Sequence, residues 1–95
     1  KTYPNIIVNV PCTAPKFNVN GIEYITDSNF TMTDKDVLEI DCERSTAILN
    51  KGTDREENAM KYFLSDTFPV FEIGDNTVSA DVDCTFVWRE RSVVI

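Results

Sequence analysis

The segment "VLEIDCERSTAILN", residues 37–50, decides the fold class because it holds two short runs of strand-forming residues. In the first run a leucine, an isoleucine and a cysteine alternate with Glu39, Asp41 and Glu43, which predicts a strand with one buried and one solvated face. The second run, "STAIL" at 45–49, follows closely enough to be the antiparallel partner. The segment therefore predicts two neighbouring strands.

Further strands are indicated on both sides of this segment. Asn-Gly at 20–21 tolerates the positive φ angles of a type I′ turn, so 17–19 and 22–26 are predicted to form a β-hairpin. The strongest alternation in the chain is at 82–88, and Arg89, Glu90 and Arg91 are predicted to be its exposed end. The other expected strands are 5–10, a weaker one at 30–33, and two that flank a Gly-Asp-Asn turn within 68–78.

One segment, "TDREENAMKYFL" at 53–64, has a helical pattern. Thr53 and Glu56 have the spacing of a capping box, and Met60, Phe63 and Leu64 would share one helix face. The segment predicts a short helix at most.

Eight or nine short strands separated by turns predict an all-β fold. The expected architecture is a two-layer antiparallel β-sandwich with at most one short helix near 54–64. A length of 95 residues, 42% of them hydrophobic and 26% charged, indicates one folded domain over 1–95. The chain starts without a methionine and ends in apolar "SVVI", so we expect it to be part of a longer protein.

The charge balance excludes several classes of partner. Nine basic residues against 16 acidic ones give a net charge of −7, with the basic residues scattered along the chain. Binding nucleic acid requires a positive surface that neutralises phosphates, and binding an anionic membrane requires the same. No apolar run approaches the roughly 20 residues that cross a bilayer. Neither nucleic acid nor membrane is an expected partner.

The three cysteines are expected to be reduced thiols. Cys12, Cys42 and Cys84 are an odd number with irregular spacing, unlike the cysteines of a disulfide-framed module. Cys42 and Cys84 fall on the apolar side of their strands and are predicted to be buried. Because the sequence contains no histidine and no CxxC pair, a zinc site is poorly supported and histidine-based nucleophile systems are excluded.

The acidic residues of the first segment have two interpretations. They resemble the E-x-D-x-E strand motif of laminarinase-like retaining glycoside hydrolases, in which Glu39 would be the nucleophile, Glu43 the acid/base and Asp41 the residue that tunes both. Alternate strand residues lie roughly 6.5–7 Å apart on one face, as the motif requires. That family, however, has more than twice this length and a sheet lined with aromatic side chains. The alternative is a solvated strand face whose charge opposes edge-to-edge pairing.

Two other kinds of site have candidate residues in the sequence. Asp34 with Asp36, or Asp81 with Asp83, could contribute to a calcium site, but Asp-x-Asp is also common on ordinary strands and calcium requires six to eight oxygens. Exposed aromatic residues could bind carbohydrate. The candidates for that role are Tyr3, Tyr24 and Tyr62, whereas the register of Trp88 places it in the core. The sequence designates no catalytic, cofactor-binding or metal-binding residue.

The order of motifs resembles the C-terminal domain of siphophage and prophage distal tail proteins. The matching segments are "YPNIIVNV", "FNVNGIEY", "DVLEIDCERSTAILN", "FPVFEIGDNTV" and "VWRERSVVI". Members of that family typically show "iD…a.lNG" and "fP.l..G.N.i", which here correspond to Ile40-Asp41 with Asn50, and to Phe68-Pro69 with Gly74 and Asn76. The chain departs from the pattern at Lys51, which separates Asn50 from Gly52, and in the longer segment at 53–64.

The resemblance implies a structural role in the tail tip. It implies a galectin-like β-sandwich outside a hexameric ring that an N-terminal domain builds, with no enzymatic activity and no cofactor. The implied partners are tail-tube, tail-fibre, receptor-binding or other baseplate proteins. The implied location is the virion tail, after assembly in the bacterial cytoplasm. Galectin-like describes the architecture and does not by itself imply sugar binding.

Overall fold

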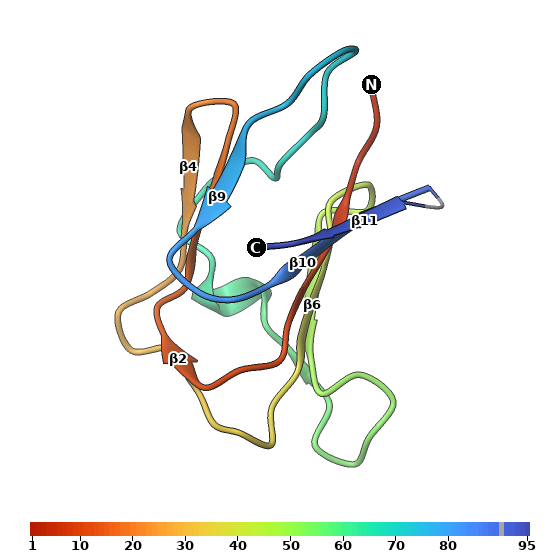
Figure 1. Ribbon diagram of the computed structural model, residues 1–95. Coiled ribbons are helices and arrows are strands. Elements are labelled where there is room, and N and C mark those ends of the chain that lie inside the picture. The colour runs from red at the N-terminus through yellow and green to blue at the C-terminus, as the bar shows by residue number, and fades with distance from the viewer. Residues whose placement is uncertain (90) are drawn as a thin grey trace.

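The computed structural model describes residues 1–89 and 91–95. These residues form eleven strands and one short 3-10 helix, and every strand pair is antiparallel. Figure 1 shows the two main sheets facing one another as separate layers. The predicted all-β, two-layer antiparallel sandwich is confirmed.

The larger sheet has six strands and is organised around the early strand β1 (Asn5–Val8). Ile6 of β1 pairs with Phe86 on one side and with Ile40 on the other, and all three side chains are buried. The alternation of apolar residues thus places one face of this sheet in the core. In spatial order the strands are β11 (Arg91–Val94), β10 (Thr85–Trp88), β1, β6 (Leu38–Asp41), β7 (Thr46–Leu49) and β8 (Glu57–Asn58).

The opposite layer is a three-stranded sheet with the order β4 (Ile22–Ile25), β3 (Lys16–Val19) and β9 (Val78–Ala80). Asn20 and Gly21 have φ angles of 53° and 83°, as a type I′ turn requires, so the predicted hairpin is confirmed. A separate short ladder pairs β2 (Cys12–Thr13) with β5 (Thr31–Met32).

The core between the layers contains an aromatic group at one end. Phe71 stacks on Phe86 with ring centroids 6.2 Å apart and meets Trp88 edge-on at 5.2 Å. Trp88 packs against the core while remaining partly exposed. Cys42 and Cys84 are buried free thiols, as predicted.

The segment 53–64 holds one short helix at most, as predicted, but the predicted capping box and helix face are wrong. The segment contains a turn, the two-residue strand β8 and a 3-10 helix over Met60–Tyr62, and Leu64 is 56% exposed. Glu56 does not act as a capping-box residue, because its carboxylate accepts the backbone N–H of Gly52 at 2.8 Å. The Thr53 hydroxyl donates to the carbonyl of Asn50 at 2.7 Å. These bonds close a tight turn and leave the following residues free to pair with β7.

Two expected strands also differ from the prediction. Within 68–77 only Phe71 makes a strand-like contact, a bridge to Thr2, and the strand begins at Val78. The expected strand at 82–88 begins at Thr85, and a further strand, β11, follows it. Arg89 lies in the turn after β10 with a φ of 54°, and Arg91 begins β11, so the predicted strand end is wrong for both; Glu90 lies outside the described residues. No helix in the described part of the chain has the length and apolarity needed to span a bilayer.

Candidate functional site

The acidic residues of β6 do not form the arrangement that the glycosidase hypothesis requires. Glu39 and Asp41 lie on the strand, but Glu43 lies in the β6–β7 turn because β6 ends at Asp41. The carboxylate of Asp41 accepts the backbone N–H of Arg44 at 3.2 Å, which helps to form that turn. The expectation that all three carboxylates share a strand face is therefore wrong for Glu43.

Cations accompany the two strand carboxylates. Lys51 Nζ lies 3.8 Å from Glu39, whose side chain is 43% exposed, and Arg44 Nε lies 3.8 Å from Asp41, whose side chain is 34% exposed. The hollow that Glu43 lines is not the one that Glu39 lines. These contacts are typical of a solvated, charge-paired sheet surface, where each ion pair contributes little to stability.

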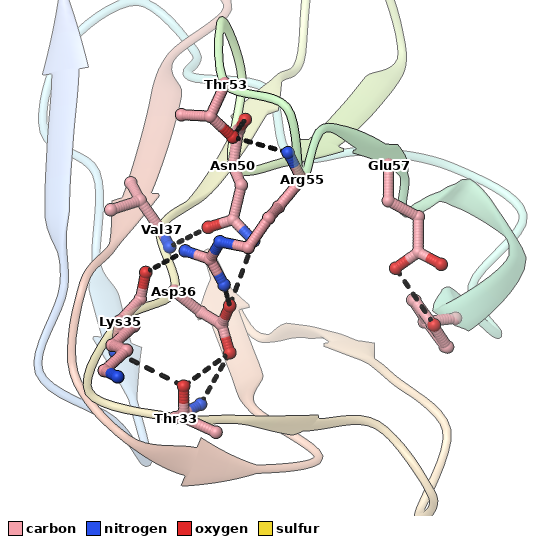
Figure 2. Close-up of polar contacts among 9 residues, drawn as sticks. Thr33, Lys35, Asp36, Val37, Asn50, Thr53, Arg55 and Glu57 are labelled. Atoms are coloured by element: carbon pink, nitrogen blue, oxygen red, sulfur yellow. Dashed lines mark hydrogen bonds and ion pairs between the residues drawn. The ribbon is translucent and has the colours of Figure 1, made fainter.

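The most highly connected carboxylate in the structure is that of Asp36, which lies between β5 and β6 (Figure 2). Its Oδ2 accepts the backbone N–H of Thr33 at 2.7 Å and the Thr33 hydroxyl at 3.0 Å. Its Oδ1 accepts the side-chain amide of Asn50 at 2.9 Å and Nη1 of Arg55 at 3.1 Å. The backbone bond from Thr33, followed by the bond from Asn50, lowers the pKa of Asp36 to about 2, although burial opposes this shift.

Asn50 completes this network from the end of β7. Its backbone and side chain form two bonds with Val37: Asn50 N donates to the Val37 carbonyl at 2.8 Å, and the Val37 N–H donates to Oδ1 at 3.0 Å. Its φ of 56° lies in the left-handed region, which asparagine adopts more readily than most residues. The network of Thr33, Asp36, Asn50 and Arg55 thus ties the β5–β6 loop to the β7–β8 loop.

The two aspartate pairs that could contribute to a calcium site do not form one. Asp34 is exposed, while its partner Asp36 is saturated by the four donors above. Asp81 accepts the backbone N–H of Lys16 at 2.8 Å, and Asp83 is exposed. Within residues 1–89 and 91–95, no three histidine, cysteine, aspartate or glutamate side chains lie together as potential metal ligands.

The three tyrosines that could bind carbohydrate are not gathered on one surface. Tyr24 is 5% exposed and belongs to the core. Tyr62 stacks on Phe30 with centroids 4.4 Å apart, and its hydroxyl donates to Glu57 at 3.2 Å. Tyr3 is 44% exposed and lines a hollow with Trp88.

Sequence reasoning missed a contact between two asparagines at one end of the sandwich. Asn20 Nδ2 donates to Asn76 Oδ1 at 2.8 Å, and Asn20 Oδ1 accepts the backbone N–H of Thr77 at 2.8 Å. Asn76 also bonds both backbone groups of Glu72. The two Asn-containing turns were each visible in the sequence, but their contact was not.

Sequence reasoning also missed a groove beside β11. A cavity of about 490 Å³ lies between β9 and β11, and we call it the β9–β11 groove. Its apolar lining comes from Phe71, Val78, Trp88 and Val93. Charged residues also line it, namely Arg89, Arg91, Glu72 and Asp75. Val94, on the neighbouring edge, is 75% exposed. The alternation at 82–88 predicted β10 but not the strand that follows it.

A family model described as the siphovirus-type tail component, C-terminal domain, matches residues 1–91. The chain belongs to this family. Searches of curated proteins and of solved structures found no significant match. The chain is therefore a structural component of a phage tail, which is located in the virion tail and interacts with other tail proteins.

In this tail component, the two asparagines of the family-typical segments have structural roles. Asn50 holds the β5–β6 and β7–β8 loops together, and Asn76 holds the turn before β9 against the β3–β4 hairpin. Both use their side chains to satisfy backbone groups in turns, which asparagine does well. The residues that resemblance singled out therefore shape the loops of the tail component.

Proposed function

We propose that this domain docks neighbouring proteins at the tip of a phage tail. In this proposal it is the C-terminal module of a longer distal tail protein and lies outside a hexameric ring whose subunit contacts are made by another domain. Its partners are a receptor-binding protein or other baseplate proteins. The observation that carries the proposal is the family match, which extends from residue 1 through the whole of β10 to the start of β11.

The geometry supports a binding role over a catalytic one. Two of the candidate carboxylates are engaged in turns and ion pairs: Asp36 with Asn50 and Arg55, and Asp41 with Arg44. General acid/base catalysis requires a carboxyl group positioned in a cleft beside the reacting bond. Polar groups that hold loops in place instead give the rigid surface that protein docking requires.

Labelling of virions tests the proposed location. Antibodies against the chain, coupled to gold, should mark the tip of the tail in electron micrographs, with antibodies against the capsid as the control. The gene should also lie among tail genes, next to a tape-measure gene. Gold along the tail tube or on the capsid, or a gene outside a tail cluster, contradicts the proposal.

A second candidate function, carbohydrate binding, is favoured by the surface pocket that Tyr3 and Trp88 line. Tyr3 and Trp88 line it together with Asn5, Asp41 and Glu43, which combines aromatic faces with hydrogen-bonding groups. Such a combination suits a small polar ligand. A glycan array with the wild type and Tyr3→Ala tests this candidate. Saturable binding lost in the variant supports it, and no binding at millimolar sugar removes it.

A further inference from the structure

Strand β11 is at the end of the six-stranded sheet, and no strand of the described residues pairs with its outer edge. Cys84 and Ile95 exchange two backbone hydrogen bonds, N–H to carbonyl in each direction, at 3.3 and 2.8 Å. In an antiparallel ladder such doubly bonded pairs alternate with pairs whose backbone groups point outward. Ser92 and Val94 are therefore the residues of β11 whose N–H and carbonyl groups point away from β10. Among the described residues these groups have no partner strand.

Two other sheet edges in the structure are shortened or partly covered. Strand β8, at the opposite edge of the same sheet, has two residues, and Glu57 on it pairs with Lys61 at 2.9 Å. At the end of the β4 edge, the following chain covers Ile25: its N–H donates to the Ser65 hydroxyl, and its carbonyl accepts the N–H of Leu64. Natural proteins use such devices to prevent unwanted strand pairing. Strand β11 has four residues, and its only charged side chain, that of Arg91, lies on the core-facing side at the start of the strand.

The inner side of β11 faces the β9–β11 groove. Val93 pairs with buried Phe86 and Arg91 pairs with Trp88, so both side chains lie on the core-facing side of the sheet. A strand added beside β11 would place its own alternate side chains on the same side. The residue opposite Val93 would enter the groove, and the residue opposite Arg91 would face a guanidinium group.

We propose that β11 binds an extended segment of another tail protein as an additional β-strand. The segment places an apolar side chain in the groove and an acidic side chain opposite Arg91, because opposite charges on paired strands stabilise the pairing. The inference rests on the proposed docking function and assigns it to one edge of the sheet.

Charge and register favour a different protein over a second copy of this chain. The outward groups belong to Ser92 and Val94, and the twofold register that pairs both of them places Ser92 opposite Val94 and Arg91 opposite Ile95. Arg91 would then face an apolar residue. Each copy also has a net charge of −7, which opposes self-association.

The substitution Val94→Pro tests strand addition directly. It removes an outward N–H that β10 does not use, and proline is tolerated on an edge strand in this position. Val94→Thr is the matched control, because it changes the side chain and keeps the N–H. The probes are the purified products of the tail genes that flank this gene, each tested alone against the chain by interferometry. Binding should be roughly tenfold weaker for Val94→Pro and nearly unchanged for Val94→Thr.

Amide exchange of the wild type provides a second measurement that needs no variant. The N–H groups of Ser92 and Val94 should exchange rapidly in the free chain and slowly in the complex, whereas those of Val93 and Ile95 should be protected in both. If a probe binds the wild type, Val94→Pro and Val94→Thr equally, or leaves the Ser92 and Val94 N–H groups unprotected, strand addition is wrong. The proposed docking function would still stand. If no flanking tail protein binds at micromolar concentration, the docking function fails as well. If the wild-type chain self-associates and Val94→Pro abolishes this, the added strand comes from a second copy of the chain and not from a different protein.

Discussion

The side-chain amide of Asn20 donates a hydrogen bond to Asn76 across 56 positions of sequence, at 2.8 Å. The bond joins the tip of the β3–β4 hairpin to the turn that precedes β9. Because Val78 follows directly after this turn and lines the β9–β11 groove, the asparagine pair also fixes one wall of that groove.

Asn76→Ala should lower the free energy of unfolding by about 1–3 kcal/mol, since it leaves backbone groups of Glu72 and the Asn20 side chain without their partner. Urea denaturation at neutral pH measures the change. Asp75→Ala, at the exposed neighbouring position, is the control and should stay within about 0.5 kcal/mol of the wild type. Equal losses for the two variants would contradict the structural role of Asn76.

The Asp36 carboxylate should make stability depend on pH in the acidic range. Its pKa falls from 3.8 to about 2 in the folded state, and a lowered pKa means that the ionised form is the stabilising one. The contribution, roughly 2 kcal/mol, is present above about pH 4 and is lost as the pH falls through about 2. Asp36→Asn should therefore be destabilised at pH 7 and approach the wild type near pH 2.

Denaturant unfolding at several pH values measures this difference between Asp36→Asn and the wild type. Asp34→Asn, in the same loop but exposed, is the matched control and should follow the wild-type profile. A gap between Asp36→Asn and the wild type that stays constant from pH 7 to pH 2 would show that the charge of Asp36 is not the stabilising element.

The three thiols should differ in reactivity. Burial raises the pKa of Cys42 to about 12 and of Cys84 to about 11, while Cys12 is only partly buried. The thiolate is the reactive form, so a thiol reagent at pH 8 should modify Cys12 first, and Cys12→Ser should remove the fast phase. Denatured protein without reductant should show all three thiols; a count of one would indicate a disulfide.

We expect no glycosidase activity from Glu39 and Glu43. Incubation with mixed-linkage and β-1,3-glucans should release no reducing ends, because Glu43 lies in a turn and Glu39 faces Lys51. Glu39→Gln should behave like the wild type. If the wild type releases reducing ends and Glu39→Gln does not, the glycosidase hypothesis would be supported again.

The isolated chain should be a monomer at micromolar concentration, because its net charge of −7 opposes self-association and the proposed ring contacts lie in another domain. Light scattering measures the mass of the chain and of the longer protein, for which we expect a hexamer. A stable hexamer of residues 1–95 alone would show that the ring surface is in this domain.

The strands and turns that were predictable from sequence are those specified by residues within the element itself. The alternation at 38–41 and the Asn-Gly pair at 20–21 each specify a strand or a turn without reference to distant residues. Such patterns failed where a side chain could bond to more than one backbone group. Glu56 had the spacing to cap a helix, but it bonds the Gly52 N–H.

The functional surface was less predictable because it depends on contacts between distant segments. The β9–β11 groove requires Phe71, Val78 and Val93 to meet, and no local pattern predicts that meeting. The burial of Asp36 likewise depends on Asn50 and Arg55 from a later loop. The sequence shows that Asp36 is an acidic residue in a loop, but only the fold shows that its ionised carboxylate stabilises the protein.

The central position of β1 has a consequence for how the domain folds during synthesis. β1 lies between β6 and β10, so one of its neighbours is made about midway along the chain and the other only near the end. Until residues 85–88 have left the ribosome, the apolar strand at 5–8 keeps an unpaired edge. Sheets built from such distant pairings fold slowly, and their incomplete forms tend to aggregate. The nascent chain therefore depends on the last strands to complete its sheet, and stalled chains that end before β10 should be the ones that chaperones retain.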